Sequence, residues 1–236
     1  MCGIAGIVHL DARPVERSAL RAMTDAIAHR GPDGEGQWTS TVQPNVGFGH
    51  RRLAIIDLSD ANAQPMSTPD GLLTVTYNGE LYNYRELREE LVALGHEFRT
   101  AGDTEVILHA WLEWGADCLP RLNGMFAFAI HDARDGTVTL VRDRYGIKPL
   151  YYAYAGRTLL FGSEQKAILA ISPVPRELDV EALLEYFTFQ NIFTDRTLVA
   201  GLRILPAGTW LRIDAHGVRA SEMVRYWDFH FTNPEG

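Results

Sequence analysis

Cysteine is scarce in this chain: of its 236 residues, only Cys2 and Cys118 carry a thiol. Two cysteines so far apart in the sequence are a poor basis for the disulfide framework that stabilises small secreted domains. This usage fits a reducing compartment best, so the expected location is the cytoplasm.

Long hydrophobic runs and basic clusters are also missing. The apolar stretch at residues 3–8 has no basic region before it and is too short for a signal peptide. No window approaches the roughly 20 apolar residues that are needed to cross a bilayer. Lys and Arg number 22 against 30 Asp and Glu, which gives a net charge of -8. We therefore expect neither a membrane nor a nucleic acid as a partner.

Motifs that bind metals or nucleotides do not occur either. The eight histidines are scattered, with no His-x-x-x-His pair, and there is no Cys-x-x-Cys pair. The sequence has no Walker loop, and its closely spaced glycines do not form a dinucleotide fingerprint. We expect no metal and no cofactor to be bound by this chain.

What the sequence does contain is the composition of a globular protein, with 46% hydrophobic residues arranged in short periodic segments. Helices are predicted at residues 18–30, after an N-cap at Asn83, from Asp103 or Thr104 to Gly115, and after a cap at Asp179. A glycine-rich loop is expected to follow the first helix, up to Gly36. The predicted strands lie at residues 3–8, 46–50, 53–56, 72–77, 125–131, 137–142, 150–154 and 158–161, with a further hairpin near residues 205–213.

These strands form consecutive hairpins, and the helices come in between them as separate groups. This order predicts an α+β layered sandwich with antiparallel sheets rather than an alternating parallel α/β fold. Pro173 and Pro175 suggest a boundary. We therefore predict a domain core over residues 1–172 and a C-terminal extension over residues 173–236.

The position of Cys2 is the strongest chemical signal. Methionine aminopeptidase generally removes Met1 before a small residue, and the mature chain would then begin with a cysteine that carries a thiol and a free α-amine. The amine, with a pKa of about 7.7 to 8.0, can accept the proton of the thiol near neutral pH. Cys2 could thus act as an N-terminal nucleophile. The alternative is a small apolar cysteine that begins a buried strand.

Several motifs, in order along nearly the whole chain, resemble those of class II glutamine amidotransferases. They are Met1-Cys2-Gly3-Ile4-Ala5-Gly6, His29-Arg30-Gly31-Pro32-Asp33, Gly49-His50-Arg51-Arg52-Leu53, Tyr77-Asn78-Gly79-Glu80 and Gly102-Asp103-Thr104-Glu105. Two further motifs resemble the glutamine-dependent asparagine synthetase branch of that family. These are Leu122-Asn123-Gly124-Met125-Phe126-Ala127-Phe128 and Arg142-Asp143-Arg144-Tyr145-Gly146-Ile147-Lys148-Pro149-Leu150-Tyr151-Tyr152.

The resemblance implies a four-layer αββα N-terminal nucleophile hydrolase fold and hydrolysis of L-glutamine to glutamate and ammonia through a Cys2 thioester. It assigns the Asn78 side chain and the Gly79 backbone N–H to the oxyanion that forms during attack. The competing interpretation of Asn78-Gly79 is a tight hairpin turn.

The resemblance also assigns the two ends of glutamine. Arg52 matches the residue that binds the α-carboxylate, with Arg51 as the alternative, and Asp103 and Glu80 match those that bind the α-ammonium. From local sequence alone, the role of a helix N-cap is favoured for Asp103, and the resemblance reverses that preference. The remaining implied positions are backbone groups of Leu53, Ile55 and Ile56 in the glutamine pocket and Arg30 near the nucleophile. Independently of the resemblance, we expect Cys118 to pack in the core, since nothing near it in the sequence suggests activation.

In this branch, a synthetase domain that binds ATP and Mg²⁺ follows the glutaminase domain, and Tyr226-Trp227-Asp228-Phe229 resembles the linker to it. The resemblance therefore implies a synthetase domain in cis or in trans as the partner, and it is compatible with a homodimer. It leaves the acceptor of the ammonia open. Two rival functions are a degenerate or regulatory glutamine-binding module and a hydrolase of a different amide.

Overall fold

The strands of the protein form two antiparallel sheets of six strands each. The computed structural model describes residues 1–56, 59–171, 174, 176–218 and 221–230. In spatial order, sheet A contains β10 (Leu202–Ile204), β8 (Tyr151–Ala155), β9 (Thr158–Gly162), β1 (Gly3–His9), β3 (Val46–Arg52) and β2 (Gly34–Thr39). Sheet B contains β12 (Glu222–Arg225), β11 (Thr209–Asp214), β7 (Thr137–Arg142), β6 (Gly124–Asp132), β5 (Leu73–Leu81) and β4 (Met66–Ser67).

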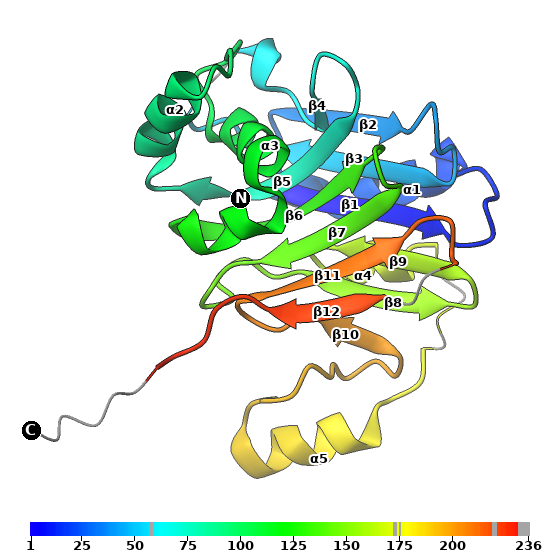
Figure 1. Cartoon of the computed structure of the whole chain (residues 1–236). Coiled ribbons are helices and arrows are strands. Elements are labelled where there is room, and N and C mark those ends of the chain that lie inside the picture. Colours follow the sequence, from blue (N-terminus) through cyan, green and yellow to red (C-terminus); the bar gives the residue numbers. More distant parts are fainter. Residues whose placement is uncertain (57–58, 172–173, 175, 219–220, 231–236) are drawn as a thin grey trace, which may run out of the picture.

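Helices cover the outer face of each sheet (Figure 1). On sheet A these are α1 (Arg17–Asp25) and α4 (Gln165–Leu169), while α3 (Asp103–Trp114) packs on sheet B and α2 (Tyr84–Ala93) packs on α3. Hydrophobic clusters fill the interface between the sheets and the interface between each sheet and its helices. The predicted four-layer αββα arrangement with two antiparallel sheets is confirmed.

The first strand shows how the sequence produces these layers. Successive side chains of a strand point to opposite faces of its sheet. Ile4 and Val8 accordingly belong to the cluster between the sheets, whereas Ala5 and Ile7 belong to the cluster beneath α1. All four side chains are buried, which explains why β1 is continuously apolar. The predicted strand at residues 3–8 is confirmed.

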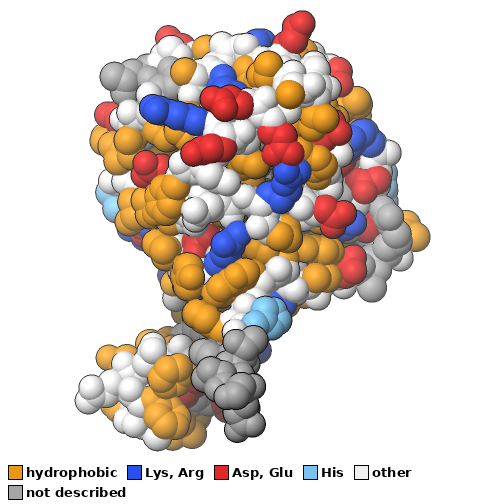
Figure 2. All heavy atoms as spheres, turned by 60° about the vertical axis from the view of Figure 1, so that its left-hand side comes forward, with side chains coloured by type: hydrophobic (Ala, Val, Ile, Leu, Met, Phe, Trp, Pro, Cys, Tyr) orange, Lys and Arg blue, Asp and Glu red, His pale blue; other side chains and the backbone are white. Residues whose placement is uncertain are grey.

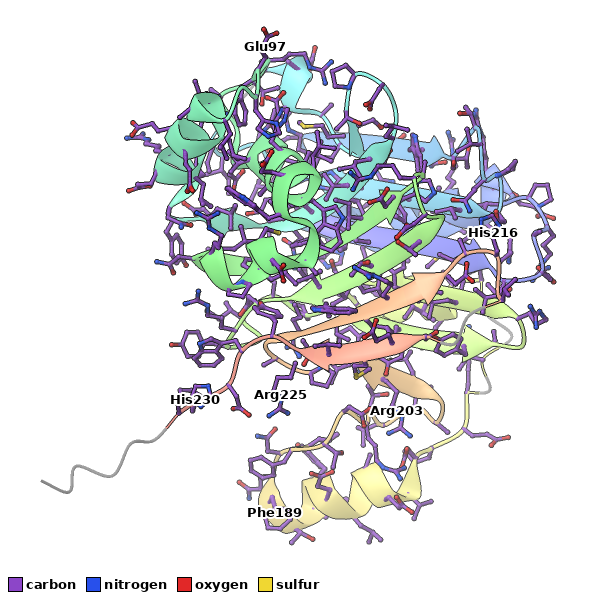
Figure 3. All side chains as sticks on the ribbon, in the orientation of Figure 1. Glu97, Phe189, Arg203, His216, Arg225 and His230 are labelled. Atoms are coloured by element: carbon purple, nitrogen blue, oxygen red, sulfur yellow. The ribbon has the colours of Figure 1, made fainter. Side chains whose placement is uncertain are left out.

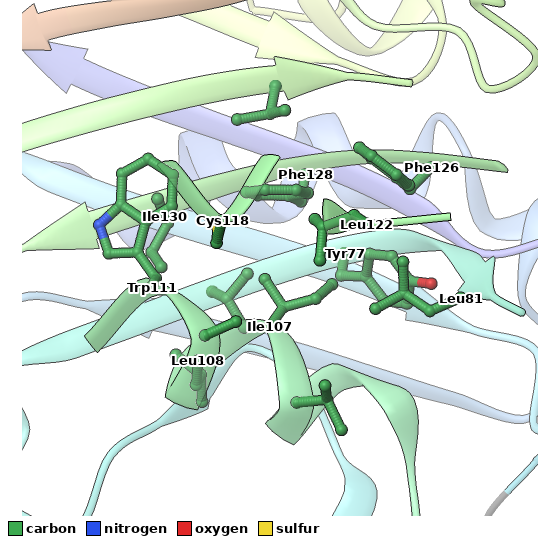
Figure 4. Close-up of a cluster of buried hydrophobic side chains, with 14 of the residues drawn as sticks. Tyr77, Leu81, Ile107, Leu108, Trp111, Cys118, Leu122, Phe126, Phe128 and Ile130 are labelled. Atoms are coloured by element: carbon green, nitrogen blue, oxygen red, sulfur yellow. The ribbon is translucent and has the colours of Figure 1, made fainter. Parts of the chain in front are cut away.

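The outer face of sheet B holds the second cysteine (Figure 4). Phe126, Phe128 and Ile130 alternate along β6 and pack against α3 and the 3₁₀ helix η3 (Gly115–Arg121). Cys118 on η3 is fully buried in this cluster. The prediction that Cys118 lies in the core is confirmed.

The first helix is shorter than the sequence predicts. It ends at Asp25, and a separate 3₁₀ turn, η1 (Ala28–Arg30), follows. The Thr24 hydroxyl donates to the carbonyls of Leu20 and Arg21, and Ile27 has left helical geometry with φ -116° and ψ 20°. Such side-chain bonds to the helix backbone compete with continuation of the helix.

Three local predictions before residue 82 are wrong. β5 continues through Asn78-Gly79 to Leu81, because β6 extends far enough to pair with it, so no hairpin turn forms there. The expected strand at residues 53–56 is absent, since the amides of Leu53 and Ala54 bond to side chains instead of to a neighbouring strand. The glycine-rich loop ends early, because β2 begins at Gly34 and pairs with β3.

The C-terminal strands divide between the two sheets. The hairpin predicted near residues 205–213 is wrong, because β10 pairs with β8 in sheet A while β11 pairs with β7 in sheet B. The boundary signalled by Pro173 and Pro175 lies outside the described residues. The division into residues 1–172 and 173–236 stays a prediction, and both sheets contain strands from each side of it.

Helix α5 (Val180–Phe189) stands apart from the four layers. As predicted, Asp179 caps it, because its carboxylate accepts a hydrogen bond of 3.0 Å from the backbone N–H of Ala182. In the space-filling view α5 forms a projecting lobe that carries hydrophobic side chains (Figure 2). Phe189 lies on this helix, below the strand that carries Arg203 (Figure 3). None of its residues lines the cavity described next.

Candidate active site

Cys2 lies immediately before β1, where sheet A brings several loops together. Gly3 pairs with Arg51 of β3, which fixes the start of the strand. The Arg30 side chain donates a hydrogen bond of 2.9 Å from Nε to the Cys2 carbonyl, and its Nη1 lies 2.8 Å from Glu164 Oε1. The early end of α1 allows this contact, because the separate turn η1 brings Arg30 next to Cys2, where the resemblance places it.

The Cys2 thiol is held by the backbone of Leu53. The amide N–H of Leu53 donates to Sγ at 3.3 Å, and Sγ lies 3.5 Å from the Leu53 carbonyl oxygen. Burial raises the pKa of the thiol, and the Leu53 amide opposes that shift because a donor favours the thiolate. Met1 is 58% exposed.

A cavity of about 170 Å³ opens beside Cys2. This volume suits a small metabolite rather than a large ligand. All residues predicted for the site line it: Cys2, Arg52, Leu53, Ile55, Ile56, Asn78, Gly79, Glu80 and Asp103. The sequence did not assign site roles to the other lining residues, which are Met1, Ala54, Asn62, Gln64, Tyr77, Thr104, Met125 and Lys148.

The open edge of β5 supplies hydrogen-bond donors to the cavity. Tyr77 N donates to Gln64 Oε1 at 2.7 Å, and Leu81 N donates to Asp103 Oδ2 at 3.0 Å. Both N–H groups therefore point away from β6. Because strand geometry repeats every two residues, the N–H of Gly79 lies between them on the same edge. A side chain at Gly79 would come within 2.5 Å of the Met125 carbonyl, so glycine is required there.

Asn78 projects to the other face of β5, toward sheet A. Thr76, two residues earlier on the strand, has its side chain on the same face as Asn78. The Thr76 hydroxyl donates to the Gly49 carbonyl of β3, so this face points toward sheet A. The Asn78 side chain is 1% exposed, and its Nδ2 has no hydrogen-bond partner among the described residues. A buried amide donor without a partner is costly unless a ligand accepts its hydrogen bond.

The two consecutive arginines of β3 point in opposite directions. Arg51 lies on the helix side, where it forms an ion pair of 2.6 Å with Glu35, another with Asp25, and a hydrogen bond to the Thr24 carbonyl. Arg52 lines the cavity. The structure therefore places the first-choice arginine beside Cys2 and gives the alternative a structural contact elsewhere.

Asp103 is the first residue of α3 and is 5% exposed. The N-cap is Gly102, so the competing prediction of Asp103 as the N-cap is wrong. Its Oδ2 accepts hydrogen bonds from the Tyr77 hydroxyl at 2.8 Å and from Leu81 N at 3.0 Å. Burial raises the pKa of the carboxyl, and these two hydrogen bonds oppose that shift.

Residues that the sequence analysis missed hold the site together. Gln64 connects the Tyr77 backbone to the Thr104 hydroxyl, which lies 3.3 Å from Nε2. Tyr77 and Thr104 occur inside the recognised motifs and could have been found by their position next to assigned residues. Gln64 lies in none of these motifs, and only the folded chain brings it to the cavity.

The part of the chain that the structure describes has neither a metal-binding cluster nor a membrane-spanning helix. No group of three or more His, Cys, Asp and Glu side chains is placed there to hold a metal ion. None of the helices in that part is both long and apolar enough to cross a membrane. The absence of a cofactor stays a prediction.

Known proteins resemble this chain in sequence over most of its length. A family model described as a glutamine amidotransferase domain matches residues 1–227. Glutamine-hydrolyzing asparagine synthetase 3 of Bacillus subtilis strain 168 is 40% identical over 232 residues, covering 97% of this chain and 37% of the relative. Glutamine-hydrolyzing asparagine synthetase 1 of the same strain is 38% identical, covering 92% of this chain and 34% of the relative. The chain thus spans about a third of the length of these curated relatives.

A solved structure shares the fold at low sequence identity. The structure of glutamine phosphoribosylpyrophosphate amidotransferase from B. subtilis, complexed with ADP and GMP, matches with a TM-score of 0.71 and 20% identity. The match covers 96% of this chain and 49% of that chain. The predicted N-terminal nucleophile hydrolase fold is confirmed.

Proposed function

Because this chain belongs to the family of glutamine amidotransferase domains and is homologous to the glutaminase part of asparagine synthetases, we propose that Cys2 hydrolyses L-glutamine through a γ-glutamyl thioester. The observation that carries the proposal is the cavity beside Cys2. It combines a thiol, an unpartnered amide donor on Asn78, and the oppositely charged side chains of Arg52 and Asp103.

The residues at the Cys2 end supply the chemistry. After removal of Met1, the free α-amine of Cys2 accepts the thiol proton, and Sγ attacks the amide carbon of glutamine. The oxyanion that forms receives hydrogen bonds from Asn78 Nδ2 and the Gly79 N–H. The C–N bond then breaks, the α-ammonium of Cys2 returns its proton to the leaving nitrogen, and ammonia departs. Water hydrolyses the thioester and releases glutamate.

The residues at the other end select a free amino acid. Arg52 offers a planar pair of donors to the α-carboxylate, and Asp103 accepts a hydrogen bond from the α-ammonium. Two bonds already occupy Asp103 Oδ2, so Oδ1 is the oxygen for the substrate. Glu80 lines the same cavity and adds negative charge on the ammonium side. An amide without both charged groups would lose its bond to one of these residues.

The ammonia is destined for an ATP-dependent synthetase domain of the asparagine synthetase type, in cis or in trans. The names of the relatives support this assignment, which makes aspartate the first acceptor to test. ATP and Mg²⁺ belong to that domain, so glutamine hydrolysis by this chain alone needs neither. We also propose a cytoplasmic location, since a free catalytic thiol is maintained best in a reducing compartment.

The test is a glutaminase assay on the chain as it stands. We expect release of glutamate and ammonia from L-glutamine, no release from N-acylated glutamine, and no change on addition of ATP. Equal hydrolysis of the N-acylated compound would favour a hydrolase of a different amide. Binding of glutamine without turnover would favour a regulatory module.

A further inference from the structure

Lys148 is a cavity residue for which the proposed reaction has no role so far. It lies in the loop between β7 and β8, within a motif that the sequence analysis used only for the resemblance. Of the 22 Lys and Arg residues, only Lys148 and Lys166 are lysines. Lys148 lines the same cavity as Cys2 and is 6% exposed.

The loop that carries Lys148 is fixed by a buried carboxylate. Asp143 is 0% exposed, and its two oxygens accept hydrogen bonds of 2.9 to 3.1 Å from the backbone N–H groups of residues 126, 145, 147 and 148. These four bonds use both carboxylate oxygens. They also attach the loop to β6, the strand that pairs with the Asn78-Gly79 segment.

A neighbouring arginine closes the loop from the other side. The Arg142 guanidinium donates to the carbonyl oxygens of Gly146 at 2.6 Å, Lys148 at 2.9 Å and Leu205 at 2.7 Å. The backbone of Lys148 is therefore bonded at both its N–H and its carbonyl. These hydrogen bonds fix the backbone from which the Lys148 side chain extends.

The ammonium group itself has no fixed anionic partner. No carboxylate of the described chain lies within 4.0 Å of Lys148 Nζ. Burial lowers its pKa, Arg30 lowers it further, and Asp143, Cys2 and Glu80 raise it. A buried cation needs a compensating negative charge. The Asp143 carboxylate is already bonded to the four amides, and Glu80 lines the same cavity. A Cys2 thiolate would add a second negative charge to the cavity that Lys148 faces.

We propose that Lys148 is a positioning residue of the glutaminase site, whose ammonium group stabilises the thiolate of Cys2. This inference rests on the proposed role of Cys2 as the nucleophile. One positive charge acts twice here, because it favours the ionised thiol and also disfavours a second positive charge on the adjacent α-amine. The first effect favours the thiolate, and the second keeps the amine unprotonated before it takes the proton, while opposing the ammonium that then forms.

Other charged groups also act on Cys2, and any test must separate Lys148 from them. The groups that interact with Cys2 or Lys148 are the terminal amine, Arg30, Arg52, Glu80, Asp103 and Asp143. None of them is altered by a substitution at residue 148. A change in thiol reactivity in such a variant therefore reports on the Lys148 charge.

The first experiment measures the rate of Cys2 alkylation by iodoacetamide between pH 5 and pH 10, with the adduct located by mass spectrometry. We expect Lys148→Met to react roughly tenfold more slowly than wild type at pH 7 and equally fast at high pH. Lys148→Arg keeps the charge and should follow the wild-type profile. The control Arg85→Met removes an exposed positive charge from α2 and should leave the profile unchanged.

Two outcomes would overturn the proposal. In one, the Lys148→Met profile superimposes on that of wild type at every pH. In the other, Lys148→Arg is as slow as Lys148→Met, which would show that shape rather than charge matters. Neither result depends on turnover of glutamine, so a failure here is distinct from a failure of the proposed glutaminase function.

A second measurement needs no substitution at Lys148. Labelling lysine with ¹³C at Cε gives two signals, one of which belongs to the exposed Lys166. If the thiolate and the ammonium stabilise each other, the Cys2→Ala change should move the Lys148 titration to lower pH and leave that of Lys166 in place. Identical Lys148 titrations in both proteins would contradict the proposal.

Discussion

The two cysteines of this chain occupy contrasting regions of the same fold. Cys118 lies on η3 in the apolar cluster outside sheet B, with no exposed surface, and burial raises the pKa of its thiol to about 12. Cys2 lies at the end of sheet A, where its Sγ contacts the Leu53 backbone and faces a cavity lined by charged side chains.

The difference shows that the surroundings of a thiol, rather than the residue type, distinguish the two cysteines. Burial raises the pKa of both thiols, but Cys2 faces a cavity and accepts a hydrogen bond from the Leu53 amide that favours its ionised form, whereas Cys118 is enclosed in the core. The four-layer fold contains both environments, an apolar core and a cavity lined by polar side chains. Their interfaces bury Cys118, and the end of sheet A, next to the open edge of β5, holds Cys2. Each prediction below tests one part of the surroundings that separate Cys2 from Cys118.

The largest effect is expected from exchanging the cysteines for alanine one at a time. Cys2→Ala should lower the rate of glutamine hydrolysis by at least about 10³-fold, because no other group in the cavity can form the thioester. Cys118→Ala should retain wild-type kinetics and lose about 1 to 2 kcal/mol of unfolding free energy, since it removes a buried sulfur. Steady-state assays and urea unfolding measure both. Wild-type turnover by Cys2→Ala would show that Cys2 is not the nucleophile.

The next effect concerns the charged residues Arg52 and Asp103, which line the cavity beside Cys2. Arg52→Ala and Asp103→Ala should each weaken glutamine binding by about 2 to 5 kcal/mol, because each leaves one charged end of the substrate unpaired in a semi-enclosed cavity. The measurement is the Michaelis constant for glutamine. Arg51→Ala is the matched control, since Arg51 bonds on the helix side. A larger effect of Arg51→Ala would reverse the assignment.

A somewhat smaller effect is expected from the amide donor beside Cys2. Asn78→Ala should reduce kcat by about 10² to 10³-fold with little change in the Michaelis constant, because an oxyanion exists only during the reaction. Single-turnover kinetics separate the two terms. Asn83→Ala is a suitable control, since the Asn83 side chain bonds to the backbone of Arg121 and Asn123 outside the cavity. Equal losses in both variants would mean that the Asn78 effect is structural.

The smallest effect is expected at Tyr77, whose hydroxyl donates to Asp103. Tyr77→Phe removes a bond that holds the pKa of Asp103 down against its burial, so that pKa should rise further. Asp103 must be ionised to bind an ammonium group, and binding is lost as the pH falls through its pKa. The Michaelis constant of the variant should therefore begin to rise at a higher pH, with a penalty of about 1 kcal/mol near neutral pH. An unchanged pH profile would contradict this coupling.

The sequence predicted most of the residues that line the cavity, because all of the assigned residues except Ile55 and Ile56 lie in short motifs. It also predicted the layered fold, since alternation along β1 and β6 encodes two buried faces. It failed where long-range contacts decide the local structure. Asn78-Gly79 has the pattern of a turn, yet pairing with β6 keeps it extended. Gln64 reaches the cavity through contacts that no local pattern shows, whereas Lys148 lies in a motif to which no site role was assigned from the sequence.

The most direct test of the central claim is to stop glutamine turnover with acid and locate the γ-glutamyl group by mass spectrometry of the intact protein and its peptides. We predict that the adduct lies on a chain whose first residue is Cys2, with Met1 removed. A γ-glutamyl group on Cys118, or full activity in protein that retains Met1, would contradict the mechanism.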